Sequence, residues 1–206
     1  MELQEVVHRR RMTRNFATDP VDRSVLSAIF SDALRAPSAG FAQGAEFLVL
    51  SAPERRETFW NLVSEPSWRE RSKFAPGVMR APVVALCLVD PAMYRSRFGA
   101  QDKSSSTLGA SDVDAWNVAY PTVDTAFSTM IVLLGAEAAG LGALFFHLQG
   151  RERLVLDGLG VPSRFEVIGA VALGHRGTEV GSTSPEKVPR RTTGERVHFE
   201  QHEGDS

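Results

Sequence analysis

The sequence of 206 residues predicts an α+β fold. Four apolar runs have the length of strands, at residues 47–50, 83–89, 142–146 and 167–173. Helical patterns stand between these runs, but they lack the regular spacing of strand and helix that builds a doubly wound parallel sheet. The irregular order therefore favours α+β.

Two helices are expected before the first strand. Residues 2–11 repeat apolar positions at helical spacing. Asp22 is a candidate N-cap for the second helix, and Pro37 is expected to end it. A turn of small residues, 38–44, then leads into the strand at 47–50.

The rest of the chain continues this pattern. Further helices are expected at residues 53–63, 122–139 and 151–159. Gly140 is expected to stop the long helix, and residues 99–112 are interpreted as a mobile surface loop. Trp116 and Tyr120 either line the mouth of a pocket or anchor the core beneath that loop.

Composition excludes several classes of protein. The formal charge of −2 argues against nucleic acid or an anionic membrane as the main partner. Cys87 is the single cysteine, so no intrachain disulfide can form, and no set of Cys and His has metal-binding spacing. No run approaches the roughly 18–20 apolar residues that span a bilayer. Residues 1–14 lack the apolar core of a signal peptide, so we expect a cytoplasmic protein.

Two segments carry residues suited to binding chemistry. Residues 9–16 contain four arginines, whose guanidinium forks suit a phosphate, although a solvated basic helix end has the same composition. Residues 36–43 form a turn of small residues that would let the backbone approach a flat ligand. Gln43 can donate and accept hydrogen bonds at the edge of a heterocycle. An ordinary connection is the alternative for this turn.

Together and in this order, the two segments resemble the nitroreductase family. That family opens with a helix ending in R-x-S-x-[RK]-x-F and continues with A-P-S-x-x-N-x-Q-P-W before a strand. The first motif is matched by Arg10, Arg14 and Phe16, and the second by Pro37, Ser38 and Gln43. The resemblance extends over essentially the whole chain, through Ala81-Pro82-Val83-Val84, Asp124, Gly140-Leu141-Gly142 and Gly160-Val161-Pro162.

The resemblance implies a three-layer sandwich, with a mostly antiparallel central sheet flanked by helices. Residues 1–206 would form one domain, and residues 178–206 would be a C-terminal extension that packs on the partner subunit. The protein would be a homodimer with FMN in the interface.

The resemblance also implies site residues. The phosphate and ribityl oxygens would be held by Arg10, Arg11, Met12 and Arg14, and by Arg190 or Arg191 from the tail. The isoalloxazine ring would lie along Pro37, Ser38, Ala39 and Gln43 of the partner subunit. Backbone near Phe146 and His147 would offer an N–H to flavin N5. We expect no catalytic side chain and no metal.

The expected activity is a ping-pong reaction in which NAD(P)H reduces FMN, which then reduces a small aromatic acceptor, a nitro compound or quinone. Four positions depart from the family motifs: Met12 replaces Ser, Phe41 replaces Asn, and Gly44-Ala45 replace Pro-Trp. Two alternatives stay open, the first of them because of Phe41 and Ala45. One is a same-fold flavin enzyme that performs dehalogenation, flavin fragmentation or deazaflavin chemistry, and the other is a non-enzymatic flavin-binding protein.

Overall fold

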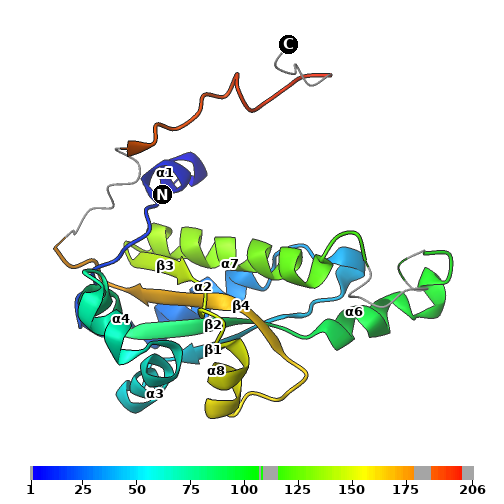
Figure 1. The fold of residues 1–206 in the computed structure, drawn as a ribbon. Helices are drawn as coiled ribbons and strands as arrows, with labels where there is room; N and C mark the ends of the chain where they lie inside the picture. The colour runs from blue at the N-terminus through cyan, green and yellow to red at the C-terminus, as the bar shows by residue number, and fades with distance from the viewer. Residues whose placement is uncertain (1, 107, 109–115, 179–186, 201–206) are drawn as a thin grey trace.

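A four-stranded antiparallel sheet forms the centre of the fold, with strand order β1-β2-β4-β3 (Figure 1). The computed structural model describes residues 2–106, 108, 116–178 and 187–200. The strands are β1 (Ala45–Leu50), β2 (Val83–Val89), β3 (Gly142–Phe146) and β4 (Glu166–Gly174). Because β2 and β4 are central, every residue of β2 is buried, which explains its continuous apolar run.

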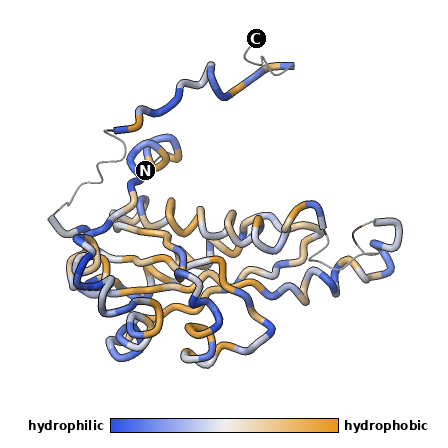
Figure 2. Tube along the Cα trace, in the orientation of Figure 1, coloured by the Kyte–Doolittle hydropathy of each residue, from blue (hydrophilic) through white to orange (hydrophobic). Residues whose placement is uncertain are grey.

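Helices cover both faces of this sheet. They are α1 (Leu3–Arg9), α2 (Arg23–Ala33), α3 (Pro53–Val63), α4 (Pro66–Arg71), α5 (Ala75–Met79), α6 (Pro91–Phe98), α7 (Tyr120–Ala138) and α8 (Glu152–Gly158). On β2, Val84 and Leu86 pack with residues of α3 and α8, whereas Val83 and Cys87 pack with residues of α2 and α7. The apolar residues accordingly concentrate between the layers (Figure 2). The predicted three-layer α+β sandwich is confirmed.

The four predicted strands and five predicted helices are present, with some corrected boundaries. Helix α2 ends at Ala33, before Pro37, and Asp22 occupies its N-cap position without a side-chain capping bond. Helices α4, α5 and α6 were not predicted. Each carries a proline in its first turn, where proline fits a helix well, but in sequence such a proline indicates a break.

The region around residues 99–112 is only partly described. Its described part contains a 3-10 turn at Gln101–Lys103, and residues 107 and 109–112 lie outside the described ranges. Trp116 is buried against Phe98, and its indole N–H donates to the carbonyl of Leu108 at 3.0 Å. For Trp116, therefore, the interpretation as a core anchor is confirmed.

The segment after α1 runs beside the sheet edge formed by β3. Met12 forms a parallel bridge with Ala143, and the Thr13 amide donates to the Ala143 carbonyl at 2.9 Å. Further along, Phe16 bridges to Arg176 after the end of β4. These contacts place the arginine-rich motif next to β3.

Two further features concern the helices and the tail. No helix within the described ranges is long and apolar enough to cross a membrane. Residues 187–200 extend away from the sandwich near α1 (Figure 1).

Candidate functional site

A cavity of about 360 Å³ lies at the C-terminal end of β3. It is lined by Arg14 from the N-terminal motif and by Phe146 and His147 from the end of β3. Two segments that are about 130 residues apart in the sequence are thus brought together, because the motif pairs with β3. These three residues belong to the set predicted from the sequence.

Another part of the cavity wall is aromatic and was not predicted. It includes Trp60 from α3, Trp68 from α4 and Phe74 just before α5. Trp60 stacks on Phe146 with ring centroids 5.6 Å apart and 12° between the planes. The signal in the sequence is the density of aromatic residues between positions 59 and 74. A flat apolar ligand would be well accommodated by such a wall.

Positive charge gathers beside the same wall. The Arg14 guanidinium carbon lies 5.6 Å from the centroid of the Phe74 ring, and the Lys73 ammonium lies 4.9 Å from it. Arg14 also donates to the Met12 carbonyl at 3.3 Å, which helps to fix its position. The cavity therefore combines apolar walls with cations, as a flat ligand with an anionic group requires.

Two buried donors have no hydrogen-bond partner among the described residues. They are Nη1 of Arg10 and Nε1 of Trp60. A buried donor without a partner is costly, and for a charged donor the cost is larger. Arg10 and Trp60 are therefore suited to donate to a ligand, and an anion fits Arg10.

The remaining residues of the N-terminal motif have other roles in the structure. Arg11 is exposed and donates to the carbonyls of His8 and Arg10. The Met12 side chain packs against the apolar clusters on both faces of the sheet, which explains an apolar residue at this position. Arg9 lies 3.5 Å from the buried carboxylate of Glu137.

His147 has a defined ring orientation. Its Nδ1 accepts a hydrogen bond from the backbone N–H of Gln149 at 3.0 Å. The backbone turns sharply here, with positive φ at Gln149 and Gly150. If the ring is neutral, the Nδ1 acceptor leaves the proton on Nε2.

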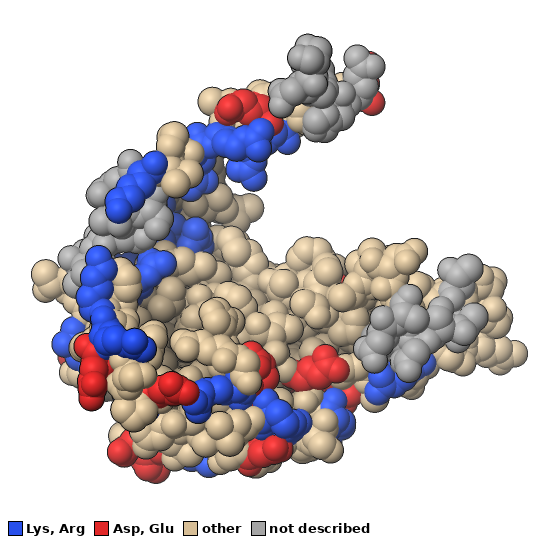
Figure 3. All heavy atoms as spheres, in the orientation of Figure 1, with Lys and Arg blue, Asp and Glu red and all other residues tan. Residues whose placement is uncertain are grey.

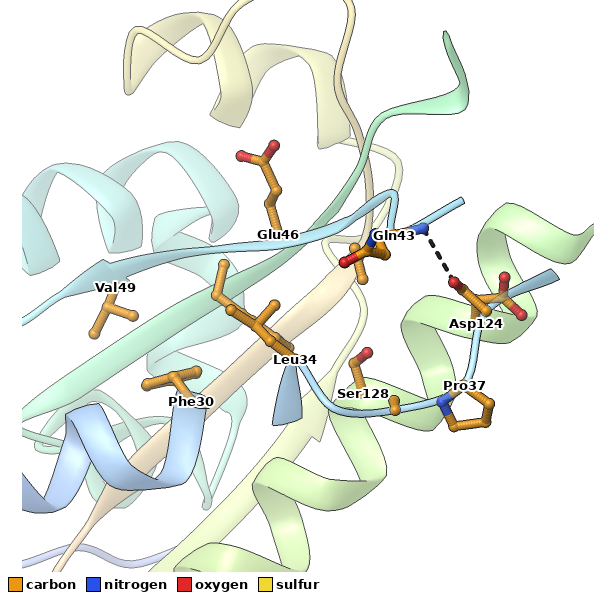
Figure 4. A pocket seen from close by; sticks show the side chains of 12 residues that line it. Phe30, Leu34, Pro37, Gln43, Glu46, Val49, Asp124 and Ser128 are labelled. Atoms are coloured by element: carbon orange, nitrogen blue, oxygen red, sulfur yellow. Dashed lines mark hydrogen bonds between the residues drawn. The ribbon is translucent and has the colours of Figure 1, made fainter. Parts of the chain in front are cut away.

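A second cavity, of about 440 Å³, contains the other predicted segment. Pro37, Ser38 and Gln43 line it together with Asp124 and Ser128 of α7 (Figure 4). The backbone N–H of Gln43 donates to the Ser38 hydroxyl at 3.0 Å, which closes the turn. Apolar side chains, among them Phe30 and Val49, make up much of the rest of the lining. Glu46 points away from Phe30 (Figure 4).

The turn at residues 36–43 is held from beneath by two side chains. Oδ2 of Asp124 accepts from the Ala39 amide at 2.8 Å and from the Tyr94 hydroxyl at 2.9 Å. Nε of Arg97 donates to the Gly40 carbonyl at 2.6 Å. Burial, followed by the hydrogen bond and charge of Asp124, raises the pKa of Tyr94 well above its ordinary value. Tyr94 therefore remains a hydrogen-bond donor over the physiological pH range.

The two cavities lie far apart within one chain. Phe146 pairs with Ala170, which pairs with Leu86, which pairs with Leu48 on β1. Three strand spacings, about 14 Å, thus separate the end of β3 from β1. The cavities also adjoin different apolar clusters, which lie on opposite faces of the sheet.

The tail arginines do not join either cavity in this chain. Arg190 and Arg191 are exposed, and Arg191 donates to the carbonyl of Glu195 at 2.9 Å. Basic side chains follow the 187–200 segment and the adjoining end of the sandwich (Figure 3). The tail therefore presents positive charge away from its own sheet.

Fold and site together define a class of protein. It is an α+β sandwich whose edge strand ends at an aromatic cavity supplied with arginine, which suits a flat anionic cofactor. The nitroreductase family model matches residues 7–175. The chain belongs to the nitroreductase family, whose members are oxidoreductases that generally use a flavin.

Solved structures agree with this assignment at the level of fold. B. megaterium NfrA2 is 16% identical with a TM-score of 0.75, and the match covers 100% of this chain and 77% of that one. Nitroreductase A from Vibrio parahaemolyticus is 19% identical with a TM-score of 0.71, covering 100% and 79%. The NADPH:FMN oxidoreductase from Vibrio harveyi, complexed with NAD+, is 20% identical with a TM-score of 0.69, covering 99% and 79%.

Proposed function

We propose that this protein is an FMN-dependent reductase that uses NAD(P)H to reduce nitroaromatic or quinone-like acceptors in a ping-pong reaction. One observation carries the proposal: Arg10 has a buried donor without a partner, and Arg14 of the same motif shares an aromatic cavity with Phe146 and His147. The similar NADPH:FMN oxidoreductase supports the choice of cofactors.

The arginine motif and the neighbouring cavity both have roles in this proposal. Arg10 and Arg14 bind the cofactor phosphate and ribityl oxygens, with Met12 and Arg11 contributing backbone. Trp60 and Phe146 exclude water from the ring, and the backbone at Phe146 and His147 donates to its edge. When bound, FMN supplies a carrier that accepts a hydride and delivers it to the acceptor. The side chains orient and desolvate the reactants, so no side-chain acid or base is required.

A homodimer completes the site. The turn with Pro37, Ser38, Ala39 and Gln43 leads into β1, which is three strand spacings, about 14 Å, from β3. Because the turn and Phe146 line separate cavities of one chain, the turn that contacts the cofactor comes from the second copy in this proposal. Apolar side chains that are exposed on one chain support burial between two copies, namely Leu3, Val7, Phe127 and Met130. We further propose that the tail packs on the partner subunit and brings Arg190 or Arg191 to the phosphate. Light scattering that gives a monomer would contradict this arrangement.

The visible spectrum of the purified protein tests the cofactor. We expect a yellow protein with FMN bound to each chain, bleached by NADPH without oxygen and restored by a quinone. Protein that takes up no FMN at micromolar concentration would refute the proposal. A flavin that NAD(P)H does not reduce would indicate a flavin-binding protein or another reaction.

Three alanine variants test the binding residues. Arg10→Ala removes a charge-assisted contact of roughly 1.5–3 kcal/mol, which corresponds to a loss of about ten- to a hundredfold in FMN affinity. Arg14→Ala should weaken binding as well. Arg9→Ala is the matched control. It removes the same charge, but from a side chain that pairs with Glu5 and Glu137. FMN titrations of the three apo proteins would contradict our assignment if Arg9→Ala matched Arg10→Ala.

A further inference from the structure

Phe41 has an unusual backbone conformation. Its φ is 62°, and Gly40 and Gln43 beside it have φ values of 59° and 54°. Glycine adopts this left-handed region freely, but for a bulky aromatic residue it is a clear outlier. Backbone strain of this kind persists only where the surrounding structure enforces it, and it clusters at functional sites.

The surrounding structure does enforce the turn. The Ala39 amide is bonded to Asp124, the Gly40 carbonyl to Arg97, and the Phe41 amide to the Ser38 carbonyl at 2.9 Å. Arg97 is itself held by Asp102 through two hydrogen bonds of 2.8 and 2.6 Å. Phe41 therefore projects from a fixed platform.

The ring of Phe41 does not stabilise its own subunit by burial. Its relative exposure is 73%, and no aromatic ring of the described residues lies against it. A strained backbone that presents an exposed apolar ring has a cost without a local gain. A contact made in the assembled protein would account for both features.

We propose that Phe41 forms an aromatic wall of the acceptor site in the partner subunit and selects flat aromatic acceptors. This inference rests on the proposed function, in which the turn at residues 36–43 faces the partner's cofactor. An electron-poor ring, such as a quinone or nitroaromatic, stacks favourably on the electron-rich face of a phenyl group. A compact inorganic acceptor such as ferricyanide gains nothing from that face. The residue therefore determines specificity and takes no part in hydride transfer.

Phe41→Gly separates this role from a structural one. Glycine relaxes the positive φ, so the thermal midpoint should be equal to or above that of the natural protein. KM for a quinone should nevertheless rise about three- to tenfold, which is the range of a single aromatic contact, while KM for ferricyanide stays unchanged. Phe41→Tyr should retain the low KM, and Phe41→Leu, which is apolar without being flat, should lose it.

A binding measurement completes the test. The probe is 2-naphthoate, a flat aromatic anion that accepts no hydride, and its Kd is measured on the FMN-loaded dimer. Phe41→Gly should raise this Kd by the same three- to tenfold factor. If the protein oxidises NAD(P)H but neither KM nor Kd depends on Phe41, the inference is wrong and the proposed function stands. If Kd depends on Phe41 but NAD(P)H is not oxidised, the aromatic wall stands and the reductase proposal fails. If Phe41→Gly is monomeric, or if both acceptors lose affinity equally, Phe41 is an interface residue and the inference is overturned.

Discussion

The buried carboxylate of Asp124 offers the sharpest test of how the binding turn is held. Its exposure is 4%, and one oxygen accepts both the Ala39 amide at 2.8 Å and the Tyr94 hydroxyl at 2.9 Å. Hydrogen bonds to a charged group contribute roughly 1.5–3 kcal/mol each. Tyr94→Phe removes one of them, so it should lower the free energy of unfolding by about 1.5–3 kcal/mol. Asp124→Ala leaves both donors unpaired and should cost about 3–5 kcal/mol.

Urea denaturation measures these effects directly. With an m-value of about 2 kcal/mol per molar urea, Tyr94→Phe should lower the midpoint by roughly 0.7–1.5 M without changing m. The double variant Asp124→Ala/Tyr94→Phe should be less destabilised than the sum of the single variants, because phenylalanine leaves no hydroxyl unpaired. Additive losses, or a Tyr94→Phe variant within about 0.5 kcal/mol of the natural protein, would show that the hydrogen bond does not hold the turn.

Three further predictions concern groups outside that network. Burial raises the pKa of the Cys87 thiol to about 12. At pH 8 in urea, a thiol reagent should therefore modify Cys87 at the same rate as the protein unfolds, and no faster. Since this pKa lies above that of the thiol in the unfolded chain, the contribution of Cys87 to stability is complete below pH ~8.5 and declines as the pH rises toward 12. Cys87→Ala should make the stability of the protein fall less steeply over this pH range. Glu137 is 3% exposed and lies between Arg9 and Arg176, of which Arg176 is the less exposed. In urea denaturation, Arg176→Ala should therefore lower the free energy of unfolding by about 2–3 kcal/mol, and Arg9→Ala by under about 1 kcal/mol. Equal losses would contradict this ranking. Gly169→Ala would place a methyl group 2.7 Å from the Phe146 carbonyl oxygen. The substitution should therefore destabilise the protein by about 1–3 kcal/mol and weaken FMN binding. Unchanged FMN affinity would show that β3 does not position the cofactor.

Much of the fold was accessible from local patterns. The run Val83–Val89 is continuously apolar because β2 is buried on both faces, and the long helix before Gly140 was recognisable by its length and its stop. The short helices were not accessible. Pro66–Arg71 and Ala75–Met79 are too short to show a helical period, and tertiary contacts rather than propensity stabilise segments of this length.

The candidate site was accessible only as separate segments. The arginine motif and the turn at residues 36–43 each carried a recognisable composition, and their order indicated the family. Trp60, Lys73 and Phe74 were missed, because nothing in the sequence relates them to Arg14 until the chain folds. The structural importance of Asp124 was missed for the same reason, since both of its partners are distant in sequence.

By itself, the sequence determined the α+β class, the positions of the main strands and helices, and the family to which the chain belongs. These properties depend on periodicity and on residue order, which are carried by neighbouring residues. Only the tertiary structure decided that Arg14, Phe146 and His147 share one cavity, whereas Pro37, Ser38 and Gln43 line another across the sheet. Strand order and register decide such distances, because each strand adds about 4.8 Å and each residue along a strand reverses the face to which its side chain points.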